Sequence, residues 1–192
     1  MTYHNNSRLK VTLMFVGFVL FISCGPVDDT AKAGDVVREA NNDLKEIKKI
    51  YEINENKRDD LKKALLTDNE AAVRQITDDL VKAIAEGSKF GVSAMEKLDQ
   101  AREMKINSDY ADYLKLKSDA LSRQLKAFDE YRQAAKKLND AYDPKNTQAK
   151  EEVKAEFKER SDRFQKNMEI AREYSSEANE FAKDVQRKEQ GN

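Results

Sequence analysis

The residue types that most often carry chemistry are scarce in this sequence. Its 192 residues include one histidine, His4, one cysteine, Cys24, and no tryptophan. Histidine is the usual general base near neutral pH and the commonest metal ligand, while a cysteine sulfur is a nucleophile or a point of covalent modification. A zinc site needs several such ligands, and one of each cannot supply them. The glycines match neither of the common phosphate-binding spacings, and the carboxylates are spread along the chain.

The first 24 residues differ in composition from the rest of the chain. Residues 1–10 are polar, with Arg8 and Lys10 as the basic residues and no acid, and residues 11–22 are almost entirely apolar. A membrane-spanning helix needs about 20 apolar residues, whereas the core of a signal peptide needs about 7 to 15. This run therefore predicts a signal peptide rather than a permanent membrane span.

The apolar run ends in Phe21-Ile22-Ser23-Cys24, which resembles the lipobox of bacterial lipoprotein precursors. The resemblance implies export, attachment of diacylglycerol to the Cys24 sulfur, cleavage after Ser23 and acylation of the new amino terminus. Two or three acyl chains hold a protein firmly on a membrane. Gly25 stands where an Asp retains many of these lipoproteins at the inner membrane, so in a double-membraned bacterium the outer membrane is favoured. The alternative is an ordinary signal peptide or uncleaved anchor with an incidental cysteine.

Cleavage after Ser23 removes much of the remaining chemistry. Arg8 and Lys10 are lost and all 36 acids are kept, so 33 basic residues remain and the net charge becomes −3. His4 is also lost, which excludes Ser-His-Asp and Cys-His catalysis and the Glu-x-x-His di-iron motif. We therefore expect no catalytic residue, no metal site, no cofactor and no enzyme activity. The lack of basic excess also argues against a nucleic-acid partner.

The composition of the remaining chain predicts helices almost throughout. Charged residues make up 37% of the sequence, which contains 6 glycines and 2 prolines, and this excludes collagen and most β-sandwiches. We predict an all-α fold, an antiparallel up-down bundle of four long helices built from two coiled-coil-like hairpins. The predicted domains are a signal peptide over 1–23, a lipidated tether over 24–34 and a bundle over 35–192.

Local capping signals set the four predicted helices. The first runs to about Leu66 from a cap at Asp35 or Thr30. The second runs to about Lys105 and opens with a capping box over residues 67–70, where a threonine and a glutamate each satisfy a free amide. The third runs from Asn107 to about Tyr142, and the fourth from Asp143-Pro144 to about Gln190.

The first two helices are predicted to pack along a seam of apolar and small residues. If the hairpin turns near residue 68, facing positions have numbers that sum to about 138. Tyr51 then faces Gly87 and Ile47 faces Gly91, so both glycines are interpreted as room for a large side chain. A hinge or a ligand slot at the glycines is the alternative.

The last two helices form a second seam, with facing numbers that sum to about 285. Leu121 then faces Phe164, and Phe128 faces Phe157. We interpret these aromatic rows as core rather than as a ligand platform.

Polar residues interrupt the second seam and are predicted to face each other. Gln124 lies against Arg160, and Lys117 against Asn167. Three interpretations are open: partly exposed positions whose long side chains reach water, polar pairs that fix the register of the helices, or a buried polar binding site.

These features predict a non-catalytic, lipid-anchored scaffold or protein-binding module of the bacterial envelope. The lipid on Cys24 is expected to attach it to the membrane. Its expected partners are an envelope protein and further copies of the same chain. The alternatives are a periplasmic chaperone or assembly factor, a carrier with an apolar cavity between the hairpins, and a surface lipoprotein that contacts a host.

Overall fold

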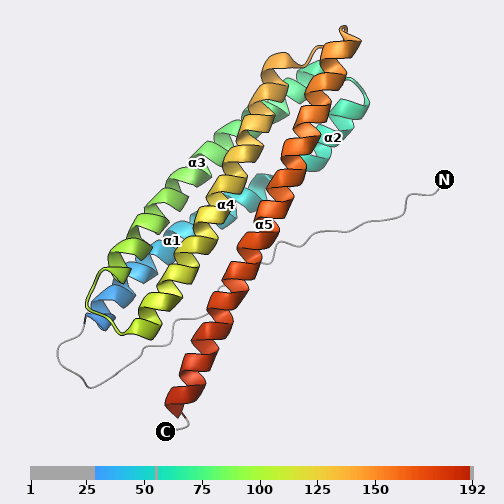
Figure 1. Cartoon of the computed structure of the whole chain (residues 1–192). Helices are drawn as coiled ribbons and strands as arrows, with labels where there is room; N and C mark the ends of the chain where they lie inside the picture. Colours follow the sequence, from blue (N-terminus) through green and yellow to red (C-terminus); the bar gives the residue numbers. More distant parts are fainter. Residues whose placement is uncertain (1–28, 55, 191–192) are drawn as a thin grey trace.

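The computed structural model describes residues 29–54 and 56–190, in which every secondary-structure element is an α-helix. The elements are α1 (Thr30–Asn54), α2 (Lys57–Leu66), α3 (Glu70–Arg102), α4 (Ser108–Ala141) and α5 (Thr147–Gln190). Together α1 and α2 form one interrupted arm, and the arms run antiparallel, up and down (Figure 1). The predicted all-α bundle of four antiparallel arms is therefore confirmed.

The first arm has the predicted start at Thr30 rather than the alternative at Asp35, but it is not the single helix predicted to run to about Leu66. It begins at Thr30, and the side chain of Ala33 is completely buried, so residues 30–34 belong to the bundle rather than to the predicted tether. It is also interrupted between Asn54 and Lys57. Asparagine side chains compete with the helix backbone for hydrogen bonds. The Asn54 side chain does so here, since its Nδ2 donates to the Ile50 carbonyl at 2.7 Å.

Asparagine side chains cap the start of the three long helices that follow. The Oδ1 atoms of Asn69, Asn107 and Asn146 each accept a hydrogen bond from a backbone amide three residues further on, at 3.1, 2.7 and 3.1 Å. Such a cap satisfies an amide that the first helical turn leaves free. The predicted cap at Asn107 is confirmed.

Two of the predicted helix starts are wrong. Thr67 closes α2 instead of opening α3, because its Oγ1 donates to the Lys63 carbonyl at 3.0 Å. Asp143 stabilises a turn instead of a helix, because its Oδ1 accepts from the Lys145 amide at 2.9 Å, and α5 begins only at Thr147. In both connections an asparagine later in the sequence caps the next helix: Asn69 caps α3 and Asn146 caps α5.

The middle of the bundle is formed by α3 and α4. α3 packs against α1, α2 and α4, and α5 packs along α4. The buried residues fall into two clusters, one built by α2, α3, α4 and α5 and the other by α1, α3 and α4. Phe128 packs against both clusters, so the core divides near the middle of the arms.

Two ion pairs show the register of the first hairpin. Lys57 Nζ lies 2.8 Å from Asp79 Oδ2, and Lys97 Nζ lies 2.6 Å from Asp43 Oδ2. Both pairs fall within about two residues of the predicted facing positions. The predicted register of this hairpin is confirmed.

The predicted register of the second hairpin is wrong. Phe128 faces Phe164, with ring centroids 6.1 Å apart, and Tyr131 faces Phe157 at 5.8 Å. The predicted partners, Leu121 for Phe164 and Phe128 for Phe157, are displaced by about one heptad. A seam with a heptad repeat offers equivalent apolar positions after such a shift. Because α5 begins only at Thr147, its residues lie further along α4 than predicted, and one of these equivalent alignments is adopted.

Asp68 joins the tips of the two hairpins. It lies in the α2–α3 connection with a φ of 50°, a left-handed conformation that Asp tolerates better than most residues. Its carboxylate accepts hydrogen bonds from the Tyr142 hydroxyl at 2.8 Å and from Lys150 and Lys154 at 2.8 and 3.2 Å. One side chain between α2 and α3 therefore holds the end of α4 and the first turns of α5.

The predicted signal peptide, the lipobox with Cys24 and the cleavage position after Ser23 lie outside the described residues. Over 29–54 and 56–190, no helix is both long enough and apolar enough to cross a bilayer.

Candidate functional site

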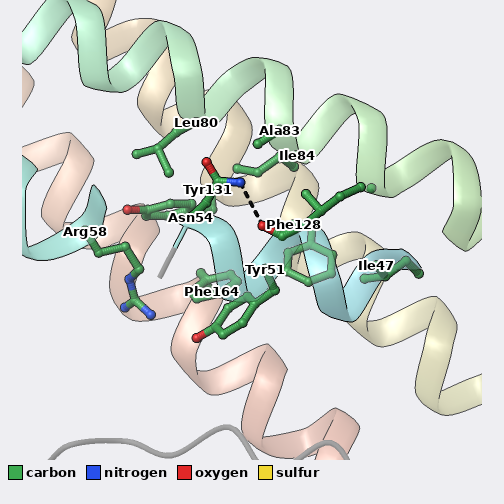
Figure 2. Close-up of a pocket in the computed structure, with 12 residues that line it drawn as sticks. Ile47, Tyr51, Asn54, Arg58, Leu80, Ala83, Ile84, Phe128, Tyr131 and Phe164 are labelled. Carbon is green, nitrogen blue, oxygen red and sulfur yellow. Dashed lines mark hydrogen bonds between the residues drawn. The ribbon is translucent and has the colours of Figure 1, made fainter. Parts of the chain in front are cut away.

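A pocket lies where the two core clusters meet, beside the break between α1 and α2. It has a volume of about 60 Å³, is open on one side, and is lined by residues from all five helices (Figure 2). Its lining residues are Ile47, Ile50, Tyr51, Asn54, Arg58, Leu80, Ala83, Ile84, Gly87, Phe128, Tyr131 and Phe164. Most of these side chains are apolar, so the pocket offers an apolar interior with few polar groups.

The interrupted first arm shapes one wall of this pocket. Tyr51 and Asn54 come from the last turns of α1, and Arg58 comes from the first turn of α2. The Lys57–Asp79 ion pair fixes the start of α2 against α3, next to Arg58. The side chains of Tyr51, Asn54 and Arg58 are half-buried, unlike the fully buried residues of the core. The first arm therefore lines the pocket with residues from both sides of its interruption.

Arg58 is the cationic group of the pocket, and it lies over two aromatic rings. Its guanidinium carbon is 5.8 Å from the ring centroid of Tyr131 and 5.5 Å from that of Phe164. A cation over an aromatic face is stabilised by the negative potential of the ring. Burial raises the pKa of the Tyr131 phenol above its ordinary value, and the nearby Arg58 opposes this rise. Tyr131 is therefore neutral at physiological pH.

The structure brings three of the four predicted packing residues to the pocket. Ile47, Tyr51 and Gly87 all line it. A Cβ atom at Gly87 would meet only Ile50 Cγ2, at 3.9 Å, so the predicted filling of this space by Tyr51 is wrong. The glycine instead borders open space in the pocket, which agrees with the alternative of a slot.

Gly91 has a different neighbour from the predicted one. A Cβ atom there would meet Leu125 Cδ2 of α4 at 2.3 Å and Leu125 Cγ at 3.2 Å. The prediction that Gly91 makes room for Ile47 is therefore wrong. The absent side chain leaves room for Leu125 and so allows α4 to approach α3 closely at this level.

The four predicted polar seam residues are half-buried, and the structure does not pair them as predicted. Arg160 pairs with Glu130 at 3.4 Å and Glu156 at 3.1 Å, and its Nη1 donates to Gln133 Oε1 at 3.2 Å, so the pairing with Gln124 is wrong. Arg160 thus makes charged contacts along the α4–α5 edge. These residues do not contribute to the pocket.

Lys117 and Asn167 are the second predicted polar pair. Lys117 Nζ lies 5.6 Å from the ring centroid of Tyr113, one turn earlier on α4. The one-heptad displacement of α5 moves Asn167 away from the predicted facing position. Lys117 therefore covers an aromatic ring of its own helix.

The sequence contained one overlooked signal for the pocket. Asn54 and Arg58 interrupt the apolar stripe of the first arm, and both line the pocket. Two consecutive polar members of a stripe are a reason to expect incomplete packing, since burying a polar group without a partner is costly. The aromatic rings of Phe128, Tyr131 and Phe164 serve both as core and as pocket wall.

Metal and family comparisons add no further assignment. In the part of the chain that the structure describes, no three His, Cys, Asp or Glu side chains are grouped closely enough to hold a metal ion. Comparisons with protein-family models, with characterised proteins and with solved structures found no match.

Proposed function

We propose that the chain is a lipid-anchored lipoprotein of the bacterial envelope whose helical bundle is a non-catalytic scaffold or protein-binding module. The observation that carries this proposal is the position of Cys24. The only cysteine of the chain directly follows a small residue at the end of a short apolar run. This is the position at which lipoprotein precursors are acylated and cleaved.

The proposed lack of catalysis rests on the residue types that follow Cys24. Residues 25–192 contain no histidine, cysteine or tryptophan. Imidazole and thiol groups supply most of the general bases and nucleophiles that work near neutral pH. The bundle is better suited to presenting surfaces on rigid helices.

The proposed location and partners follow from the anchor. Acylation of Cys24 places the bundle at a membrane surface, and Gly25 favours the outer membrane over the inner one if the cell has both. We expect the partner to be another envelope protein, or a second copy of the chain.

The apolar pocket supports a second candidate function, that of a carrier for a small apolar ligand. Pockets of this kind, apolar with a few polar groups, are the usual form of small-molecule sites. The two functions are compatible, since a scaffold can also hold a ligand.

Metabolic labelling tests the anchor. Cells that produce the full chain are grown with an alkyne-bearing palmitate, and the label on the protein and its membrane fraction are measured. The chain is expected to carry label and to sediment with membranes, and Cys24→Ala is expected to abolish the label. A matched control combines Cys24→Ala with Ser176→Cys, which moves the thiol to an exposed position on α5 and should remain unlabelled. Equal labelling of Cys24→Ala would contradict the proposal.

The partner is tested separately in intact cells. A cross-linker applied to cells producing the full chain is followed by mass spectrometry of the captured proteins. Enrichment of an envelope protein, or of the chain itself, is expected, with a loss of that enrichment in Cys24→Ala. Capture that is unaffected by Cys24→Ala would contradict a partner reached through the anchor.

A further inference from the structure

We infer that the pocket beside the α1–α2 break binds a short apolar chain that ends in an anionic head group, of the chemical class of medium-chain carboxylates. Arg58 is the partner of the head group, and the apolar lining holds the chain. This inference rests on the second candidate function, that of a carrier, and names its ligand class; it does not depend on the lipid anchor.

The lining favours an apolar occupant over water. A buried water is stable when it has two to four polar partners. One polar side chain of the lining, that of Asn54, already donates to the Ile50 carbonyl at 2.7 Å. Leu80, Ala83 and Ile84 offer the interior no hydrogen bond. Hydrocarbon in this space removes further apolar surface from water, at about 25 cal/mol per Å².

The volume sets the length of the chain. A cavity of about 60 Å³ holds roughly four to six water-sized groups, at about 10 to 15 Å³ each. A methylene group is similar in size to a water molecule, so the pocket accepts a chain of a few carbons. It is too small for a steroid or a long folded acyl chain, and a longer ligand extends through the open side.

The charge of Arg58 sets the head group. The neighbouring Lys57 is neutralised by Asp79, but Arg58 takes part in none of the ion pairs found among the described residues. The rings of Tyr131 and Phe164, whose centroids are 5.0 Å apart, lie on the same side of the guanidinium. Arg58 also makes a hydrogen bond to the Tyr131 side chain, and the other N–H groups of its planar fork are left for an acceptor. A carboxylate matches this fork with two parallel hydrogen bonds.

The arrangement of the lining gives the ligand a direction. Figure 2 shows Arg58 at one end of the lining and Ile47 at the other, with the aromatic side chains between them. A carboxylate at Arg58 therefore directs its chain past Tyr51 and toward Phe128. Gly87 borders the same space without a side chain, which keeps the path open.

A photoreactive probe tests this site in the full chain, in native membranes. The probe is an eight-carbon carboxylate with a diazirine near its methyl end, and the labelled peptides are identified by mass spectrometry. Labelling is expected at the lining of α1, α3 and α4, and excess octanoate should compete while octylammonium should not. Labelling that is absent from these helices, or that octylammonium displaces equally well, would overturn the inference.

Two kinds of variant separate the roles of charge and space. Arg58→Gln is expected to reduce labelling roughly tenfold, since a charge-assisted pair contributes about 1.4 kcal/mol or more. Arg58→Lys should retain part of it. Gly87→Leu fills the pocket and should abolish labelling, with Ala83→Met as a second filling variant if the first unfolds by circular dichroism.

Arg123 provides the matched control for Arg58. It is an arginine on α4 whose guanidinium carbon also lies over an aromatic ring, that of Tyr174 at 5.4 Å, but it does not line the pocket. Arg123→Gln is therefore expected to leave labelling unchanged. Equal losses in Arg58→Gln and Arg123→Gln would show a general effect of charge and would reject Arg58 as the head-group partner.

Discussion

At the scale of single residues, Gly87 and Gly91 lie one turn apart on α3 and have opposite surroundings. Both are completely or almost completely buried. A Cβ atom at Gly87 has ordinary contact with one atom, whereas a Cβ at Gly91 would overlap the Leu125 side chain. A glycine within a helix costs about 1 kcal/mol relative to alanine. The close approach of α4 explains why this cost is tolerated at Gly91.

Alanine at each glycine is therefore expected to have different effects on stability. Gly87→Ala should raise the free energy of unfolding by up to about 1 kcal/mol, because helix propensity improves without a clash. Gly91→Ala should be less stable than Gly87→Ala by about 1 to 3 kcal/mol, because Leu125 must move. Urea unfolding followed by circular dichroism measures both.

A second substitution checks the cause of this difference. Combining Gly91→Ala with Leu125→Ala removes the overlapping atoms, so the two changes should cost less together than the sum of their separate costs. Strict additivity, or equal stability of the two single alanine variants, would show that Leu125 does not limit the space at Gly91.

At the scale of helices, the α4–α5 pair shows how a repeating seam leaves its register open. Tyr131 packs against both Phe157 and Phe164, with ring centroids 5.8 and 5.0 Å apart. Apolar positions repeat about every seven residues along both helices, so several alignments bury similar surface. The α4–α5 connection and the ion pairs of Arg160 select the observed one.

Paired cysteines distinguish the two registers directly. In a Cys24→Ser background, Gln133→Cys with Arg160→Cys is expected to react rapidly with a short bifunctional maleimide, because these side chains are in hydrogen-bond contact. Gln124→Cys with Arg160→Cys should react at least about tenfold more slowly, because the two positions are separated along the helix axis by roughly 13 Å at 1.5 Å per residue. The cross-linked fraction is read by mass spectrometry. Faster reaction of the second pair would restore the register predicted from the sequence.

At the scale of the whole molecule, Asp68 connects the two hairpins through a single carboxylate. The pKa of this carboxyl lies well below its ordinary value of 3.8, first because Lys150 donates to it and next because Tyr142 and Lys154 do. Burial and the bond to Asp68 raise the pKa of the Tyr142 phenol to about 12. The ionised aspartate and the neutral phenol are thus the stabilised forms.

The stability contributed by Asp68 is expected to depend on pH. A group whose pKa is lowered by folding stabilises the fold above its unfolded-state pKa, and this stabilisation is lost as the pH falls toward the folded value. Asp68→Asn should therefore have a lower melting temperature than the natural chain at pH 7. The difference should shrink below about pH 4. Thermal unfolding by circular dichroism between pH 7 and pH 2 measures it.

Asp162→Asn is the matched control for this prediction. Among the described residues, Asp162 pairs with Lys158 of its own helix alone, at 3.4 Å, and both side chains are largely exposed. Such pairs contribute little to stability, so this variant should follow the natural chain at every pH. If Asp68→Asn also follows it, or keeps the same difference at pH 7 and pH 3, the link between the hairpins is not electrostatic.

The amino-acid sequence by itself determined the features that depend on near neighbours. The apolar spacing of three and four residues, with few glycines and prolines, was enough to predict four antiparallel arms, and the cap at Asn107 is a local signal. The register of the first hairpin followed as well, since its short connection allows little sliding.

Only the tertiary structure decided the features that depend on distant parts of the chain. The pocket beside the α1–α2 break is bounded by residues of all five helices. The polar residues Asn54 and Arg58 interrupt a local stripe, but no local pattern predicts that Arg58 lies over the rings of Tyr131 and Phe164. Leu125, which contacts Gly91, comes from another helix. The register of α5 could not be predicted because a heptad repeat presents the same apolar positions after a shift of seven residues. Local spacing sets which face of a helix is buried, but the distance between helices sets what that face meets.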